Sequence, residues 1–445
     1  MEADFVIVGS GSAGSALAAR LSEDGKNSVI VIEYGGTDAG PFIRMPAALS
    51  YPMNMGIYDW GYSSEPEPNL GNRRLAAPRG KVIGGSSSIN GMVFVRGHAE
   101  DFNHWSEMGA TGWSYADVLP YFKRMETSHQ HGRIGGEEGW RGTDGPLNVR
   151  RGDLKNPLFR AFIEAGRQAG FGVTEDYNGR RQEGFGEMEQ TIHDGRRWSA
   201  ADAYLKPALK RENVSLVKGL ARRIVIENHR ATGVEIEIRG RVQVINARRE
   251  VVIAASAFNS PQLLELSGIG RPEVLEAQGI ALQHELPAVG ENLRDHIAPR
   301  LAWKVKKPGI TYTLGLSLYK QGLKYIFTRK GLLSLPASPI RGYIRTREGL
   351  VSPDVGVSFF PFTQENFKLT SQPGLTAVPH QLRPESLGSI HIKSPSPDVQ
   401  PAIHFNFLSA ELDRQTVISA VKETRRLINA PPLDEIRGEA LSPGP

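Results

Sequence analysis

Three glycines near the start of the sequence have the spacing of a dinucleotide-binding turn. Gly9, Gly11 and Gly14 follow an apolar run, Asp4–Val8, and overlap the beginning of a helix-like stretch that continues over Ser15–Leu21. In such a turn the first glycine makes the tight bend, the second lets the backbone approach a pyrophosphate, and the third lets helix and strand pack closely. The helix N-terminus would offer free N–H groups and the positive end of its dipole to the phosphates.

A carboxylate stands where the same mechanism needs one. A second apolar run, Ser28–Ile32, ends in Glu33, about 20 residues after Gly14. Its side chain could accept hydrogen bonds from both hydroxyls of an adenosine ribose, and it would repel a phosphate at the 2′ position. NAD and FAD both use this geometry, so the motif by itself leaves the choice between them open.

Two later stretches combine glycine with serine, Gly80–Gly97 and Ser256–Gly270. Each resembles, position by position, one of the two sequence signatures of the glucose–methanol–choline (GMC) family of flavoprotein alcohol oxidoreductases. The nearest group is its choline-dehydrogenase-like branch. Similar blocks occur along most of the chain: Tyr58–Trp60 with Pro66, Gly112–Trp113, Leu119–Phe122, Gly145–Leu147, Asp176–Gly179, Gly184–Gly186, Arg197–Pro207, Val289–His296 and Gln381–Ser386.

The resemblance implies an FAD cofactor, and the residue types fit one. A flavin is a wide, flat ring that needs close approach of the backbone along its edge, and small residues such as Gly84 and Gly85 permit that approach. Ile89 stands where some members carry the histidine that binds FAD covalently, so we expect a non-covalent cofactor. The cofactor-binding residues that the motif and the resemblance predict are Gly9, Gly11, Ser12, Gly14, Glu33, Val82, Gly85, Asn90, Gly91, Met92, Val93 and Ala221.

The resemblance also implies an α/β fold with two domains. We expect a discontinuous, Rossmann-like FAD-binding domain in residues 1–155 and 196–300. A smaller substrate domain, with an antiparallel sheet flanked by helices, should take residues 156–195 and 301–445. Alternating and β-branched residues predict strands within 212–255, and the segments VGVSFFPF and GSIHIKS are typical of strands in the substrate domain. Asp413–Asn429 has the period of an amphipathic helix.

The expected reaction is FAD-dependent oxidation of a primary alcohol to an aldehyde, with oxygen or a quinone as electron acceptor. The family's catalytic histidine belongs to a segment that we expect to lie beyond Pro445, so no catalytic residue is assigned. The alternative is a catalytically impaired, flavin-binding remnant with an exposed sheet edge. The eleven histidines include the pair His129 and His131, which lacks a third metal ligand, so no metal site is predicted.

Composition and charge argue against several other classes of function. The chain has no cysteine, which excludes disulfides and thiolate ligands. Its net charge is +5, but the lysines and arginines are scattered, which favours a solvated surface over nucleic-acid binding. No signal peptide or membrane-spanning run is visible, so we expect a cytoplasmic protein with at most peripheral membrane contact, and a homo-oligomer is compatible with the sequence. An NAD-dependent dehydrogenase and a non-catalytic binding protein are the hypotheses from other classes.

Overall fold

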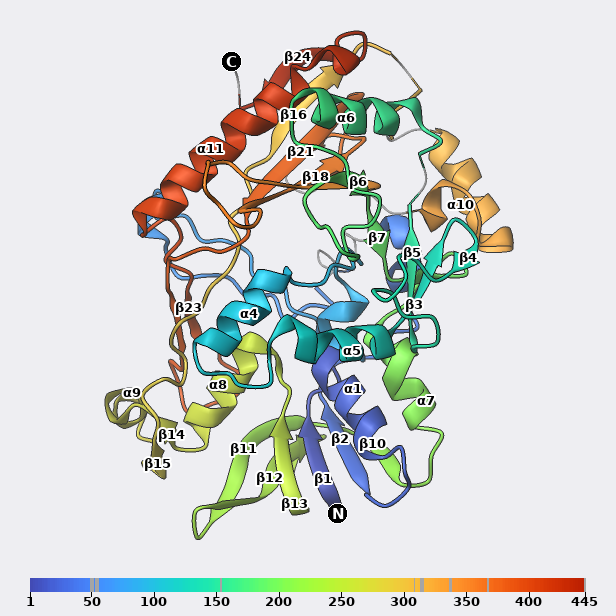
Figure 1. Ribbon diagram of the computed structural model, residues 1–445. Helices are drawn as coiled ribbons and strands as arrows, with labels where there is room; N and C mark the ends of the chain where they lie inside the picture. The colour runs from blue at the N-terminus through green and yellow to red at the C-terminus, as the bar shows by residue number, and fades with distance from the viewer. Residues whose placement is uncertain are drawn as a thin grey trace.

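Two six-stranded sheets organise the computed structural model, which describes residues 1–48, 52, 56–152, 154–307, 309–312, 316–335, 338–365 and 368–443 (Figure 1). The strands of the first sheet come from the first 253 residues, and five of the six strands of the second come from residues beyond 300. This division agrees with the predicted α/β class, in which one sheet is Rossmann-like and the other is antiparallel.

The first sheet is parallel on one side and antiparallel on the other. In spatial order it runs β10 (Val214–Lys218), β2 (Val29–Glu33), β1 (Glu2–Val8), β13 (Arg241–Ile253), β12 (Arg230–Ile238) and β11 (Leu220–Glu227). Strand β13 belongs to both parts. It pairs antiparallel with β12 up to Asn246 and parallel with β1 from Asn246 to Ile253. The strands predicted within 212–255 are confirmed.

Burial on both faces explains why β1 and β2 are almost wholly apolar. Val29 and Val31 face helix α1 (Ser12–Leu21), while Ile30 and Ile32 face the side covered by α8 (Ser256–Leu266). Strands buried on both faces in a parallel sheet read as continuous apolar runs rather than as alternating ones. The parallel register places the carboxyl ends of β1, β2 and β13 at one edge, with Val8 opposite both Ile32 and Ile253.

The second sheet is antiparallel throughout. Its spatial order is β24 (Arg437–Ser442), β16 (Leu301–Val305), β21 (Gly374–Gln381), β18 (Val355–Phe360), β17 (Ile340–Ile344) and β6 (Gly184–Glu187). Helices α6 (Pro157–Gln168) and α11 (Glu411–Ile428) lie over one face of this sheet (Figure 1). The antiparallel sheet, its flanking helices and the predicted helix near Asp413–Asn429 are confirmed.

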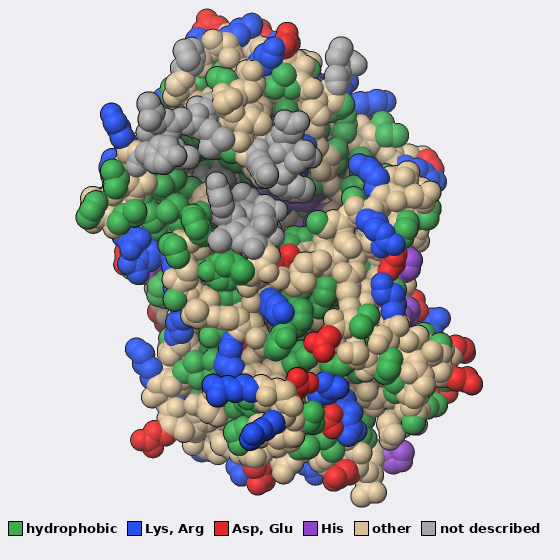
Figure 2. All heavy atoms as spheres, turned by 180° about the vertical axis from the view of Figure 1, so that it is seen from behind, with side chains coloured by type: hydrophobic (Ala, Val, Ile, Leu, Met, Phe, Trp, Pro, Cys, Tyr) green, Lys and Arg blue, Asp and Glu red, His purple; other side chains and the backbone are tan. Residues whose placement is uncertain are grey.

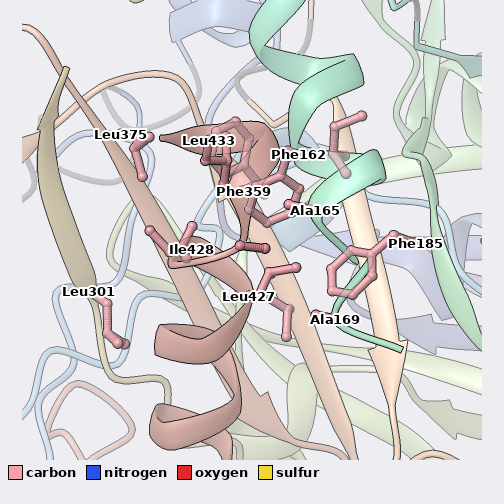
Figure 3. Close-up of a cluster of buried hydrophobic side chains, with 14 of the residues drawn as sticks. Phe162, Ala165, Ala169, Phe185, Leu301, Phe359, Leu375, Leu427, Ile428 and Leu433 are labelled. Carbon is pink, nitrogen blue, oxygen red and sulfur yellow. The ribbon is translucent and has the colours of Figure 1, made fainter. Parts of the chain in front are cut away.

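The largest hydrophobic cluster lies between these two helices and the second sheet. Phe162 of α6 packs on Phe359 of β18, with ring centroids 4.0 Å apart, and Leu427 and Ile428 of α11 close the other side (Figure 3). Alternation along the strands sends every second side chain, such as Val355 and Phe359, into this cluster. The intervening side chains therefore point to the opposite face of the sheet.

Smaller elements connect and cover the sheets. A four-stranded sheet orders β4 (Arg133–Ile134), β3 (Glu126–Gln130), β5 (Leu147–Arg151) and β7 (Glu189–Gln190). Strand pairs are β8 (Ile192–His193) with β9 (Arg196–Arg197), β14 (Ile269–Gly270) with β15 (His284–Glu285), β19 (Gln364–Glu365) with β20 (Lys368–Leu369), and β22 (Ser389–His391) with β23 (Ala402–His404). The other α-helices are α2 (Pro41–Arg44), α4 (Ala99–Glu107), α5 (Tyr115–Met125), α7 (Lys206–Ala208), α9 (Pro272–Ala277) and α10 (Leu316–Thr328). Residues Ala201–Leu205 form a π-helix, and short 3-10 helices span Pro46–Ala48, Pro68–Leu70, Gly85–Ser88, Leu332–Ser334 and Pro431–Leu433.

One strand prediction needs a correction. The segment GSIHIKS forms β22, but this strand does not belong to the second sheet and pairs only with β23. The resulting ribbon packs on α8, where Ile390 and Ile403 share a buried cluster with Phe258. Nδ1 of His391 lies 2.7 Å from Oε1 of Glu265, a buried α8 carboxylate, and this hydrogen bond raises the pKa of His391. Apolar contact and this hydrogen bond thus attach the ribbon to the helix that covers the first sheet.

A buried network of charges centred on Arg141 joins segments that are far apart in the chain. Its guanidinium donates hydrogen bonds of 2.8 Å each to Glu126, Glu189 and Asp176. Glu126 accepts a second bond of 2.8 Å from Arg96. Burial alone would lower the pKa of Arg141, but the carboxylates of Glu189 and Glu126 outweigh that effect and raise it. The raised pKa keeps Arg141 charged, whereas burial also raises the pKa of Glu189. Through Arg96, the network holds residues 94–97 against β3.

The domain boundaries near residues 155, 195 and 300 stay a proposal. The strands of the first sheet all fall within 1–155 and 196–300, and those of the second within 156–195 and 301–445, which supports the proposed division. Elements of the second set also reach across these boundaries: β7 pairs with β5, β8 pairs with β9, and the ribbon of β22 and β23 packs on α8.

We predict that Arg141→Met destabilises the protein by about 3–5 kcal/mol, because it leaves the Glu126 and Glu189 carboxylates buried without their main partner. Urea unfolding followed by circular dichroism measures this loss. Arg167→Met is the matched control, since it breaks an exposed ion pair with Glu164 and should barely move the unfolding midpoint. Equal midpoint shifts in the two variants would contradict a structural role for the network.

Candidate functional site

The predicted dinucleotide turn adopts a backbone that only glycine permits. Gly9 has φ +102°, and a Cβ built on it would lie 2.4 Å from the carbonyl oxygen of Ala254, the residue after β13. A Cβ on Gly14 would lie 1.9 Å from the carbonyl oxygen of Gly9. Gly9 therefore makes the bend against the neighbouring strand, and Gly14 lets α1 pack against the bend itself. The two glycines play the parts that the sequence assigned to them.

Gly11 stands apart from these two glycines because space is left beside it. A Cβ there would meet no atom closer than Cα of Gly85, at 3.9 Å, and Gly11 is the residue that immediately precedes α1. A Cβ on Gly85 would in turn lie 2.8 Å from Cα of Gly11. The two glycine loops thus touch backbone to backbone. A side chain at Gly85 would separate them.

Between these loops lies a cavity of about 560 Å³. The N-termini of α1 and α8 both open into it, through Ser12 and Ser256. A helix N-terminus presents unpaired N–H groups and positive potential, so two of them suit a pyrophosphate. Six of the twelve predicted cofactor-binding residues line this cavity, namely Gly9, Gly11, Ser12, Glu33, Gly85 and Ala221.

Glu33 is more heavily engaged within the protein than the sequence suggested. Its carboxylate accepts hydrogen bonds from N and Oγ of Ser10, at 2.9 and 2.6 Å, and from N of Gly35, at 2.5 Å. Only 8% of the residue is exposed, where it lines the cavity. An ionised carboxylate has about four lone-pair positions, so acceptor capacity remains for a ribose hydroxyl. These bonds fix the carboxylate at the end of β2.

Of the other six predicted residues, Gly14 lies within α1 and five lie along residues 82–93. Val82 and Met92 are fully buried, so their side chains pack inside the protein. Met92 also uses both backbone groups, since its N–H donates to Oδ1 of Asn90 and its carbonyl accepts from Thr191. It can therefore offer a ligand van der Waals contact alone. Gly91 has no atom within 4 Å of a built Cβ, which leaves room beside its backbone.

Asn90 and Ile89 form the end of the glycine–serine loop. Asn90 is exposed, and its Oδ1 accepts a 2.8 Å hydrogen bond from Arg197, a fully buried residue whose pKa burial lowers to about 9. Ile89 is buried in a cluster with Val82 and Ile43. Its hydrocarbon side chain cannot form a covalent bond to a flavin. Val93 continues the segment and pairs with Gln190.

Sequence reasoning missed an aromatic wall of the cavity. Tyr34 and Trp60 both line it and stack on each other with centroids 5.5 Å apart, and the Lys81 ammonium lies 4.5 Å from the Tyr34 ring. Arg79 also lines the cavity, above the ring of Phe258 at 4.1 Å. Trp60 and Arg79 stand in or beside sequence blocks that resemble the family, so the sequence did mark them. Their spacing could not show that they line the same cavity as Tyr34.

The structure also locates the histidine pair and the surface charges that the sequence singled out. Within the described residues, no group of three histidine or carboxylate side chains is placed to hold a metal ion. His129 instead lies 2.7 Å from Asn148, and His131 lies 2.9 Å from Glu187. On the face shown in Figure 2, lysine and arginine are interspersed with acidic and polar residues. None of the helices in the described ranges is both long and apolar enough to span a membrane.

The chain is similar to known proteins in both sequence and structure. The sequence model described as GMC oxidoreductase matches residues 3–298 with its N-terminal part and residues 384–445 with its C-terminal part. The chain is 56% identical to an oxygen-dependent choline dehydrogenase of Rhizobium etli and 54% identical to that of Rhizobium meliloti. In both cases the alignment covers 100% of this chain and 81% of the relative.

Solved structures give the same answer. Pyridoxine 4-oxidase from Mesorbium loti superposes with a TM-score of 0.87 at 30% identity, over 99% of this chain and 83% of that one. Formate oxidase from Aspergillus oryzae, a protein in which FAD is modified, superposes with a TM-score of 0.91 at 25% identity. The superposition covers 100% of this chain and 84% of formate oxidase.

We predict that Gly14→Ala weakens FAD binding about 5- to 150-fold, because its Cβ would clash with the Gly9 carbonyl and push α1 away from the turn. The measurement is the flavin content of the purified variant, followed by titration of the apoprotein with FAD. Gly322→Ala in α10 is the control, since its Cβ meets no atom within 4 Å. A wild-type affinity in Gly14→Ala would refute the assignment of this turn.

Proposed function

The chain belongs to the GMC oxidoreductase family and is an FAD-dependent oxidoreductase of CH–OH donors, and we propose that it converts a primary alcohol into the aldehyde. The observation that carries this proposal is the cavity at the carboxyl edge of the first sheet, where two glycine loops meet without side chains. Gly85 and Ser86 in its wall belong to the loop that continues into Asn90–Val93, the segment that the resemblance assigns to the flavin.

The residues of the cavity fit FAD in extended form. Gly11 and Ser12 at the N-terminus of α1 would bind the pyrophosphate, and Glu33 would accept from the adenosine ribose. The backbone at Ala221, with Tyr34 and Trp60, would enclose the adenosine end. Gly85 and residues 90–93 would hold the ring system, without a covalent bond because Ile89 offers none. These assignments are proposals that the open space beside Gly11 and Gly91 supports.

The chemistry divides between the cofactor and the chain. When bound, FAD supplies the acceptor for the hydride that leaves the alcohol carbon. The chain must hold the alcohol against that acceptor and provide a group that takes the hydroxyl proton, a task for which neutral imidazole is suited near pH 7. We assign this base to none of the histidines in the described residues.

The electron acceptor is proposed to be oxygen or a quinone. The names of the relatives, oxygen-dependent choline dehydrogenase, make oxygen the first acceptor and choline one of the first alcohols to test. We also propose a cytoplasmic location with at most peripheral membrane contact. A homo-oligomer is proposed as well, and light scattering of the purified protein tests it.

We predict that the purified protein shows the absorption bands of an oxidised flavin and that a primary alcohol bleaches them under anaerobic conditions. Admitting oxygen should restore the bands if oxygen is the acceptor, and a soluble quinone should do so if it is not. Addition of NADH serves as a control that should leave the bands unchanged. Bands that no alcohol bleaches would overturn the proposed reaction while leaving the FAD site intact.

A further inference from the structure

Arg341 is a buried cation on the face of the second sheet that turns away from the main hydrophobic cluster. Its neighbour Ile340 and, further along β17, Ile344 point into that cluster beneath α6 and α11. Alternation along the strand therefore sends Arg341 and Tyr343 to the opposite face. Arg341 is 9% exposed, although a guanidinium ordinarily reaches solvent or a carboxylate.

The partners of Arg341 carry no negative charge. Its Nη2 donates to Nε2 of His380 at 2.9 Å, its Nη1 donates to Oγ of Ser358 at 3.2 Å, and the cation lies 5.1 Å from the centroid of the Tyr343 ring. Nε donates to no acceptor in the part of the chain that the structure describes, and no carboxylate there forms an ion pair with this arginine. A buried charge without a counter-charge is unfavourable until an anion joins it.

Two histidines beside Arg341, His380 and His296, are held neutral. They therefore neither balance its positive charge nor add to it. Burial, the Arg341 cation and His296 together hold the pKa of His380 well below its usual value. Neutral His380 then accepts from Arg341 through Nε2. Burial likewise lowers the pKa of His296, whose ring centroid lies 5.2 Å from that of His380. The cluster therefore carries one net positive charge, on the guanidinium.

The cluster borders the cofactor region on two sides. His296 follows Asp295, whose charge acts on Arg79 in the wall of the cavity. On the other side, Tyr343 packs on Tyr177 with centroids 5.6 Å apart.

The Tyr177 hydroxyl donates to the carbonyl of Phe94 at 3.0 Å, and Phe94 is the residue after Val93. Arg341 is thus connected through Tyr343 and Tyr177 to Phe94, which follows the segment 90–93 that is proposed to hold FAD. A substrate bound between the flavin and this sheet would meet its charge.

We propose that Arg341, held by His380 and Ser358, binds a carboxylate of the alcohol substrate, so that this enzyme acts on hydroxy acids rather than on quaternary ammonium alcohols. The inference rests on the proposed oxidation of alcohols and adds the substrate class. A guanidinium offers five N–H donors, of which two are used here, and a planar carboxylate takes two more side by side. One positive charge also matches a carboxylate better than a phosphate, which carries nearly two negative charges.

Kinetics with three alcohols of similar size tests the charge preference in the FAD-loaded enzyme. We expect 3-hydroxypropionate to exceed both 1-propanol and choline in kcat/KM. Arg341→Gln should lower kcat/KM for 3-hydroxypropionate about 100-fold, the effect of removing one partner of a buried charge pair, with little change for 1-propanol. Arg341→Lys should restore part of the loss. The control is Arg345→Gln, which breaks an exposed pair with Glu183 near the end of the same strand.

Binding supplies a readout that does not depend on turnover. Titration calorimetry of the FAD-loaded protein with propionate should show binding that Arg341→Gln abolishes and Arg345→Gln retains, and tetramethylammonium should not bind. Propionate binding without turnover of any alcohol would sustain the inference and remove the proposed reaction. Turnover of 1-propanol or choline without propionate binding would sustain the proposed reaction and overturn the inferred carboxylate site. Tighter binding of inorganic phosphate than of propionate would overturn the carboxylate assignment, as would equal losses for all three alcohols in Arg341→Gln.

Discussion

The buried charges around Arg141 are the constraint on which the arrangement of the molecule depends. Arg141, Arg96, Glu126 and Glu189 come from four separate stretches of chain, and none of them can leave its place without exposing a partner to an apolar surrounding. Such a network is stable when complete and costly when any member is missing. It fixes the path of residues 94–97, and so the position of Asn90–Val93 just before them.

A second constraint comes from glycines, because they have no side chain. The cofactor cavity exists because Gly9, Gly14 and Gly85 let three backbones approach to distances at which a Cβ would clash. The carboxyl edge of a parallel sheet then adds two helix N-termini, and the preset carboxylate of Glu33 stands at the same edge. Both constraints are built from the backbone and from buried charge, which makes the site rigid before any ligand enters.

These constraints also explain what the sequence could and could not predict. Local patterns sufficed for the turn at Gly9–Gly14, the strands within 212–255 and the helix near Asp413, because each depends on residues close together in the chain. The stack of Tyr34 on Trp60, the ribbon of β22 on α8 and the Arg341–His380 contact depend on tertiary register, which no local pattern encodes. The role of Glu33 as the ribose-binding carboxylate stays a prediction, and its three internal donors were visible only in three dimensions.

The place of β6 in the second sheet has a consequence for how the protein is made. This strand, Gly184–Glu187, pairs with β17, Ile340–Ile344, on one side, and on the other side Phe185 is hydrogen-bonded through the backbone to Gly172 and Thr174. The opposite edge of the sheet, β24, is among the last segments of the described chain. On the ribosome, the local contact with residues 172–174 can form early, but the pairing with β17 must wait until the whole antiparallel part of the first sheet has emerged. That pairing is highly non-local, and loop closure over that length is slow. Newly made chains therefore pass through a stage in which the side of β6 that will meet β17 is unpaired, and chaperone binding then competes with aggregation.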